Sequence, residues 1–284
     1  MGRTLHVATV SMTPDLNPDV SRERLCERIV EAKKTHPDLR LIHFGETILG
    51  WFHVKGESKA YHRRIAETVP GPTTAAVATL ARQLDLYVCF GLSERDGEKV
   101  YNTQVLIGPD GRIAAKHRKF WMRSPAFDQG DRALTVADVD DARVVLLICA
   151  DARSFWLMRA IRRARADIVL ASLADYATDA RLNRMMGCFY DAWNVVANRC
   201  SEEPPIRWPG MITATDRWAR LRAHSVNEPT ALFVEIPICR SGFLGRAGRR
   251  FLVIFKLVGL VAWFGFSCLL KGLTKRARPK SSSE

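Results

Sequence analysis

The sequence has no pattern of paired cysteines. Its 284 residues include seven cysteines, an odd number at scattered positions, and no Cys-x-x-Cys motif occurs. Disulfide frameworks and structural zinc sites need regularly spaced cysteines, so this usage argues against both kinds of cross-link. The cysteines are therefore expected to be reduced thiols, as in a cytosol, and they predict no metal site.

The sequence also lacks a signal peptide, an internal repeat and a nucleic-acid recognition motif. The opening stretch MGRTLHVATVSMTP leads almost directly into a strand-like run. Basic residues are not interleaved with aromatic residues as on nucleic-acid-binding surfaces. We therefore expect a cytosolic body that has no nucleic-acid partner.

The positive charge is concentrated at the end of the chain. The whole sequence carries a net charge of +13. Residues 240–284 contain ten Lys or Arg and one Glu, a net charge of +9, whereas residues 1–239 contain 33 basic and 29 acidic residues, a net charge of +4. The body is thus ordinary in charge, and the basicity belongs to a separate tail.

The body alternates between strand-like and helix-like segments. One helix is predicted to start at Pro18, because Asn17 is a suitable N-cap and apolar residues recur at helical spacing after it. Alternating strands and helices followed by a run of strands indicate an α/β layered fold. The predicted strands are 5–12, 39–46, 85–94, 143–149, 166–174, 193–199, 210–214, 219–224 and 231–238, with a hairpin over 100–119, and the predicted helices are 17–34, 72–84, 152–164 and 178–192.

Three polar residues follow predicted strands at positions where α/β sheets gather their functional groups. They are Glu46, Lys119 and Cys149. Taken singly, each has an ordinary explanation: a solvated glutamate, a surface lysine and a buried cysteine. Cys149 has a second interpretation, as a nucleophile at a helix N-terminus whose dipole favours the thiolate.

Four segments together resemble the nitrilase (carbon–nitrogen hydrolase) superfamily. LIHFGETILGWF is similar to the family's glutamate segment, and GLSERDGEKVYNTQVLIGPDGRIAAKHRKFWM to its lysine segment, with the pairs Tyr101–Asn102 and Arg118–Lys119. LLICADAR resembles the nucleophile segment Ile-Cys-x-Asp-x-Arg, and WNVVANRC the late strand before the closing sheet. The resemblance covers about residues 4–238, with the segments in the family's order.

The resemblance implies a four-layer α-β-β-α sandwich, to which a C-terminal hydrophobic helix would be added, and a Glu–Lys–Cys site. Cys149 would attack the substrate's carbonyl or nitrile carbon, with Glu46 as general base. Lys119 and the backbone N–H of Ala150 would stabilise the oxyanion. This chemistry needs no metal or organic cofactor, and the family resemblance predicts a homodimer that acts on a small-molecule amide.

Departures from the family pattern leave the substrate open. Gly45 replaces the usual proline before the glutamate and is expected to loosen the backbone there. Many members carry a second glutamate between lysine and cysteine, and whether Asp128 replaces it stays open. Trp51, Trp121 and Phe155 are candidate substrate-binding residues because they lie near the three site segments.

The tail contains a hydrophobic run with the length of a membrane-spanning helix. The stretch FLVIFKLVGLVAWFGFSCLL, residues 251–270, has one charge in twenty residues and basic residues on both sides. A span would carry a basic tail across the membrane, against the positive-inside tendency, whereas an in-plane anchor would not. An arm buried against a partner subunit is the alternative.

The predicted organisation follows from these segments. Residues 1–239 form the hydrolase domain, 240–250 a basic linker, 251–272 a hydrophobic helix that anchors in or spans a membrane, and 273–284 a basic disordered tail. The catalytic domain would then lie on the cytoplasmic side of a membrane.

Three functions are compatible with the sequence. The first is a cysteine-nucleophile hydrolase of a non-peptide amide or carbamoyl group. Nitrile hydrolysis is less favoured, because nitrilases typically carry Cys-Trp-Glu where this chain has Cys149, Ala150 and Asp151. The second is an N-acyltransferase that uses the same acyl-enzyme, and the third is a non-catalytic scaffold held at a membrane.

Overall fold

The computed structural model describes residues 3–122, 124–176, 178 and 180–238. The chain divides into two compact units, residues 1–240 and 241–284, and the description below concerns the first. The linker, hydrophobic helix and tail predicted over 240–250, 251–272 and 273–284 lie outside the described residues. Within the described part of the chain, no helix is long and apolar enough to cross a membrane.

The first of two six-stranded sheets contains the N-terminal half of the body and its last strand. Its strand order is β14-β1-β2-β3-β4-β5. β1 pairs in parallel with β2 and antiparallel with β14, so the last strand closes the sheet beside the first. The strands are β1 (Arg3–Ser11), β2 (Leu41–Phe44), β3 (Tyr87–Asp96), β4 (Lys99–Ile107), β5 (Ile113–Arg118) and β14 (Thr230–Ile238).

The second sheet has the order β13-β12-β9-β8-β7-β6, and a separate hairpin joins β10 to β11. β7, β8 and β9 are parallel neighbours, so their C-terminal ends lie at one edge of the sheet. The strands are β6 (Thr135–Val139), β7 (Ala142–Ile148), β8 (Ile168–Leu173), β9 (Trp193–Asn198), β10 (Cys200–Glu203), β11 (Ile206–Pro209), β12 (Ile212–Thr215) and β13 (Leu221–Ser225).

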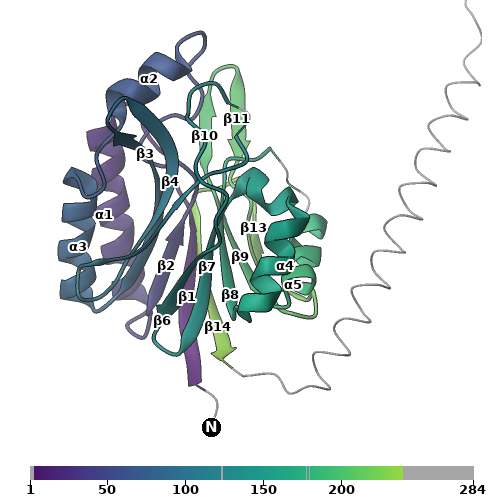
Figure 1. The fold of residues 1–284 in the computed structure, drawn as a ribbon. Coiled ribbons are helices and arrows are strands. Elements are labelled where there is room, and N and C mark those ends of the chain that lie inside the picture. Colours follow the sequence, from purple (N-terminus) through teal and green to yellow (C-terminus); the bar gives the residue numbers. More distant parts are fainter. Residues whose placement is uncertain (1–2, 123, 177, 179, 239–284) are drawn as a thin grey trace, which may run out of the picture. The chain divides into compact units, whose positions relative to one another are not determined.

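Helices cover the outer face of each sheet, which gives the four α-β-β-α layers that the family resemblance implies (Figure 1). α1 and α3 bury their apolar faces on the first sheet, and α4 and α5 on the second. The helices are α1 (Pro18–Thr35), α2 (Ser58–Ile65), α3 (Pro72–Leu84), α4 (Phe155–Ala164) and α5 (Arg181–Tyr190).

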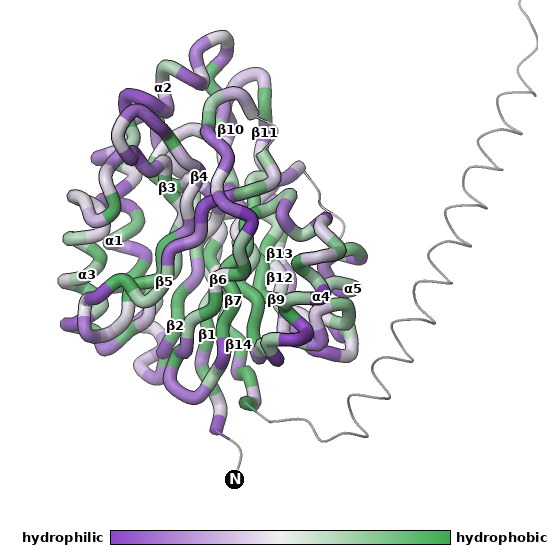
Figure 2. The backbone as a smooth tube through the Cα atoms, viewed as in Figure 1, coloured by the Kyte–Doolittle hydropathy of each residue, from purple (hydrophilic) through white to green (hydrophobic). Residues whose placement is uncertain are grey.

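The two sheets enclose an apolar layer between them. Leu41 on β2, Leu106 on β4 and Leu170 on β8 belong to this layer, and none of the three is exposed to solvent. β2, β8 and β9 are buried along their whole lengths, as expected for strands covered on both faces. Figure 2 shows the resulting hydrophobic centre, with hydrophilic residues concentrated on the helices and loops.

The structure differs from the sequence prediction at short elements. The helix predicted over 152–164 begins instead as a 3₁₀ turn at Cys149–Arg153, and α4 follows it. The elements α2, β6, β10 and β11 were not predicted. β10 and β11 have four residues each, and β6 is an edge strand of five, so their periodicity is too short to detect.

The topology brings the ends of three strands together. β5 runs parallel to β2, because β3 is parallel to β2 and the two hairpin steps through β4 reverse direction twice. The N–H of Glu46, after β2, donates to Leu173 O at the end of β8, 3.3 Å away. The C-terminal edges of both sheets therefore meet, and Glu46, Lys119 and Cys149 all follow strands that end there.

A glycine on β3 makes room for the segment that carries Glu46. A Cβ atom at Gly91 would lie 2.6 Å from Thr47 N, 2.7 Å from Gly45 O and 3.0 Å from Glu46 Cα, all of them backbone atoms. We predict that Gly91→Ala lowers the free energy of unfolding by about 1–3 kcal/mol, because the backbone around Glu46 must move. Denaturant unfolding measures this change.

The matched control is Gly108→Ala at the end of β4. The tightest contact of a Cβ atom there is 3.0 Å, to the exposed carboxylate of Asp110, and Tyr87 Cε1 and Arg112 O lie at the ordinary distances of 3.6 and 3.9 Å. The carboxylate is a side-chain group that can shift slightly, unlike the backbone atoms around Gly91. The effect of Gly108→Ala should stay within about 0.5 kcal/mol. Equal effects of the two substitutions would contradict the prediction.

Candidate active site

Glu46 is held by both sheets. Its side chain is buried, and Oε1 accepts hydrogen bonds of 2.6 Å from Lys119 Nζ and of 2.6 Å from Asn102 Nδ2. Oε2 accepts a bond of 2.8 Å from the N–H of Ala174, which follows β8 of the second sheet. The carboxylate is therefore fixed in place by one cation, one amide and one backbone group.

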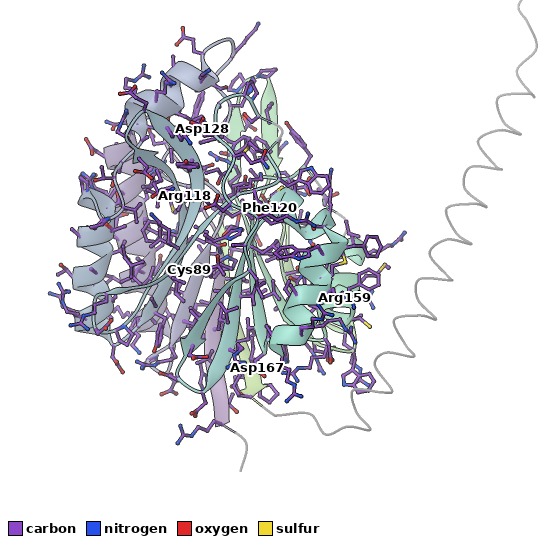
Figure 3. The ribbon with its side chains drawn as sticks, viewed as in Figure 1. Cys89, Arg118, Phe120, Asp128, Arg159 and Asp167 are labelled. Carbon is purple, nitrogen blue, oxygen red and sulfur yellow. The ribbon has the colours of Figure 1, made fainter. Side chains whose placement is uncertain are left out.

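Lys119 directly follows β5 and is also buried. Its backbone N–H donates to Asn102 O at 2.9 Å, which extends the pairing of β4 with β5 by one residue. Burial by itself would lower the pKa of Lys119, but the nearby charges of Glu46, Cys149 and Asp151 outweigh burial and raise it. The ammonium is therefore charged at neutral pH. Figure 3 labels Arg118 and Phe120, which flank this residue in the chain.

Cys149 begins the 3₁₀ turn after β7 in a strained backbone conformation, with φ at 41°. Burial raises the pKa of its thiol to about 12, the charge of Glu46 adds to this effect, and Lys119 opposes it. The idea of a thiolate stabilised at a helix N-terminus is thus wrong, because α4 starts only at Phe155, with Ser154 as its N-cap. The thiol of Cys149 is therefore protonated at neutral pH, and a nucleophilic role would require a base.

Gly45 does not loosen the backbone before Glu46, contrary to expectation. A Cβ atom there would lie 3.1 Å from Asn198 C and 3.2 Å from Arg199 N. Glycine instead allows this segment to pack closely against the end of β9. The glycine therefore belongs to the joint between the two sheets.

A buried ion pair supports the loop that follows Glu46. Arg199 and Glu203 contact each other without solvent exposure. Arg199 also donates to Thr47 O and Gly50 O, and the Glu203 carboxylate accepts the N–H groups of Phe52 and His53. The sequence does not single out these two residues, because charged residues after a strand usually lie on the protein surface.

Two further residues near the site occur in the family-like segments, but their contacts become visible only in the structure. Asn102 stands in the Tyr101–Asn102 pair, and only the structure reveals its bond to Glu46. Asp151 stands in the Ile-Cys-x-Asp-x-Arg segment. Its buried carboxylate accepts a bond of 2.8 Å from Trp121 N and lies 3.0 Å from His117 Nε2.

The other candidate residues have different surroundings. Ala150 is buried beside Cys149, Trp51 is partly buried, and Trp121 is attached through its backbone to the turn of the nucleophile. Phe155 exposes 80% of its surface, which fits an outer face better than the wall of an enclosed pocket.

Asp128 is exposed and caps a strand. Its carboxylate accepts a bond of 2.8 Å from Val100 N at the start of β4. Figure 3 places it toward the end of the molecule where α2 and β10 lie. Its contacts are therefore those of a structural cap. Among the described residues, no three His, Cys, Asp or Glu side chains are placed to hold a metal ion.

Comparison with known proteins adds independent information. Residues 6–215 match the model of a family described as carbon-nitrogen hydrolase. The chain is 35% identical over 164 residues to a nitrilase of Paraburkholderia phymatum, covering 52% of this chain and 47% of the relative. It is 28% identical over 192 residues to a formamidase of Bacillus cereus, covering 66% and 56%. The chain thus spans about half the length of the curated relatives that it matches.

Solved structures agree on the fold. A Saccharomyces cerevisiae member of branch 10 of the nitrilase superfamily superposes with a TM-score of 0.75 at 18% identity, over 83% of this chain and 90% of the other. An amidase from Nesterenkonia superposes with a TM-score of 0.73 at 17% identity, over 84% and 92%. At these identities the likeness concerns the fold alone.

The raised pKa of Cys149 predicts an unusual pH dependence of alkylation. Because only the thiolate reacts, the rate with 2-iodoethanol should rise by about tenfold per pH unit beyond about pH 9, where an ordinary thiol has levelled off. Peptide mass spectrometry separates Cys149 from the other cysteines. A plateau near pH 8.5 would contradict the buried, protonated thiol.

Glu46→Gln provides the internal control. It removes the neighbouring negative charge that raises the pKa of Cys149, so alkylation at a fixed pH should become faster.

Proposed function

Because the chain belongs to the carbon–nitrogen hydrolase family, the nitrilase superfamily, we propose that it hydrolyses a non-peptide amide or carbamoyl C–N bond through a thioester on Cys149. The observation that supports this most directly is the buried contact of 2.6 Å between Lys119 Nζ and Glu46 Oε1, next to a protonated thiol. A base, a fixed cation and a nucleophile are the groups that acyl transfer requires.

In the proposed acylation step, Glu46 takes the proton of the Cys149 thiol as sulfur attacks the substrate carbon. Oε2 accepts one bond from Ala174, and its second lone pair serves the thiol proton. The oxyanion that forms is stabilised by the Lys119 ammonium and by the N–H of Ala150. When the C–N bond breaks, Glu46 returns the proton to the leaving ammonia or amine, and the acyl group stays on sulfur.

Deacylation reverses these roles with water. Glu46 takes a proton from the attacking water, the same two donors stabilise the second oxyanion, and the C–S bond breaks. The proton returns to the Cys149 sulfur, so the enzyme regains its starting state. Each step uses groups of this chain and the substrate alone.

The substrate class is a small amide or carbamoyl compound. Relatives named as nitrilase and as formamidase are both similar to this chain, so the preference for an amide rests on the segment that begins at Cys149. The sequence Cys149, Ala150 and Asp151 agrees with this preference, since nitrilases typically carry Cys-Trp-Glu. Trp51 and Trp121 stay predicted substrate-binding residues, whereas the exposure of Phe155 argues against that role.

Trapping the acyl-enzyme tests the proposal. The Nesterenkonia amidase has a variant that carries the acetamide moiety of fluoroacetamide on its active-site cysteine, so small amides and fluoroacetamide are suitable probes. We expect an adduct on Cys149 and release of ammonia from simple amides. Glu46→Gln should reduce turnover by about 10²–10⁴-fold, and Cys149→Ala should abolish the adduct.

The same assay separates the alternatives. An acyl group transferred to an added amine, without free acid, would indicate the N-acyltransferase. Absence of any adduct across formamide, aliphatic amides, aromatic amides and carbamoyl compounds, in a folded protein, would contradict the hydrolase and favour the scaffold.

We also propose that the chain forms a homodimer and attaches to a membrane. Exposed apolar side chains on α4 and α5 support the dimer, and the sequence of the tail supports the membrane attachment. Phe155 and Leu182 expose 80% and 62% of their surfaces on these two helices. Exposed apolar side chains mark an interface where they form one contiguous patch, and a dimer through α4 and α5 would require this of Phe155 and Leu182. The run at residues 251–270 has the composition of a membrane anchor.

Removal of residues 241–284 distinguishes an anchor from a partner arm. The site residues lie within residues 1–239, so we expect catalysis to survive while the protein moves from the membrane fraction to the soluble fraction. Size-exclusion chromatography of the truncated chain should still give a dimer. Loss of the dimer would indicate the arm, and a full-length chain that stays soluble without detergent would contradict the anchor.

A further inference from the structure

The carboxylate of Asp151 is a buried charge to which the steps above assign no role. It stands two residues beyond Cys149 in the same 3₁₀ turn, and solvent does not reach it. Oδ1 accepts the bond of 2.8 Å from Trp121 N, and Oδ2 lies 3.0 Å from His117 Nε2. A buried carboxylate strongly requires such partners, so these contacts constrain the local structure.

The two partners of Asp151 flank Lys119 in the chain. His117 belongs to β5 of the first sheet and Trp121 follows this strand, whereas Asp151 belongs to the turn after β7 of the second sheet. One side chain therefore fixes the chain on both sides of Lys119 against the turn that carries Cys149. This contact crosses from one sheet to the other at the catalytic edge.

The direction of the hydrogen bonds is determined by their chemistry. An ionised carboxylate only accepts, so His117 Nε2 must donate to Asp151. His117 Nδ1 lies 3.0 Å from the Thr135 hydroxyl on β6, which fixes the other side of the ring. The chain from Thr135 through His117 to Asp151 holds the end of β5 in one orientation.

Asp151 also acts on the charge of Lys119. The charged or titratable groups whose attraction raises the pKa of Lys119 are Glu46, Cys149 and Asp151. On the other side, Tyr190 of α5 is near Asp151. Burial raises the pKa of Tyr190 and the carboxylate adds to this effect, so the phenol stays neutral.

We propose that Asp151 is a positioning residue that holds Lys119 at its place opposite Cys149, through His117 and the Trp121 backbone, for the reaction proposed above. It does not touch the substrate. It has two separable effects, since its two oxygens fix geometry and its charge keeps the neighbouring ammonium protonated.

Two substitutions separate these effects, and a third is the control. Asp151→Asn keeps the volume and an acceptor for Trp121 N–H but removes the charge, whereas Asp151→Ala removes both. Asp216→Asn is the control, because Asp216 is also buried, accepts the N–H groups of Trp218 and Arg220, and likewise faces a basic side chain, Arg222. It follows β12 beside the start of β9, at the end of the second sheet away from Cys149.

Steady-state kinetics on the full chain give the first measurement. We expect Asp151→Ala to lower kcat by about 10²-fold with KM changed by less than about twofold, because displaced oxyanion stabilisation affects the transition state. Asp151→Asn should lower kcat by about tenfold and shift the alkaline limb of the pH profile to lower pH. The sign follows because loss of the carboxylate charge lowers the pKa of Lys119, and the required ammonium is then lost at lower pH.

Alkylation of Cys149 by 2-iodoethanol gives a second measurement that needs no turnover. In Asp151→Ala the ammonium is less well placed to attract the thiolate, so alkylation at about pH 8 should slow by about tenfold. Asp151→Asn should stay closer to the parent protein. If the parent protein forms no acyl-enzyme, the hydrolase proposal fails, whereas this measurement still tests the placement of Lys119.

A purely structural role predicts a different set of results. Asp151→Ala and Asp216→Asn would then lose similar unfolding free energy while both kept the parent kcat, alkaline limb and alkylation rate, and this outcome would overturn the proposal. Should Asp151→Ala not fold, an unchanged alkaline limb in Asp151→Asn would overturn it instead.

Discussion

A buried ammonium and a buried carboxylate, 2.6 Å apart, place the strictest demand on this molecule. Each buried charge would strongly destabilise the fold without the other, so the folded chain must bring Lys119 and Glu46 into contact. Asn102 and the Ala174 N–H each occupy one further lone pair of the carboxylate. The pair thereby ties β2, β4 and β5 to the end of β8 in the other sheet.

The joint between the sheets is built from close backbone contacts at the same edge. Gly45 and Gly91 allow the Glu46 segment to approach β9 and β3 more closely than any side chain would permit. Thr47 and Cys149 both have positive φ values, 44° and 41°. The backbone is therefore strained directly after Glu46 and at Cys149, and the packed sheets around these two positions hold the strain.

The thiol gains its reactivity from neighbours and not from its own acidity. Burial and the charge of Glu46 keep Cys149 protonated at neutral pH. A thiol of this kind becomes a nucleophile only when a base within reach removes its proton as the substrate arrives. Glu46 and, as we propose, Asp151 thus act on Lys119, whose pKa they raise, while Glu46 and Lys119 act in opposite directions on the pKa of the Cys149 thiol.

The sequence by itself determined the layered α/β fold, the helices α1 and α3, the β4–β5 hairpin and the three polar residues at strand ends. These features follow from apolar periodicity, caps and turns, which are local properties of the chain. It also supplied the four segments that carry the family resemblance. It could not reveal the raised pKa of Cys149, the bond from Asn102 to Glu46 or the partners of Asp151. Each of these depends on burial and on contacts between residues at least 30 positions apart, and only the packing of one sheet on the other decides them.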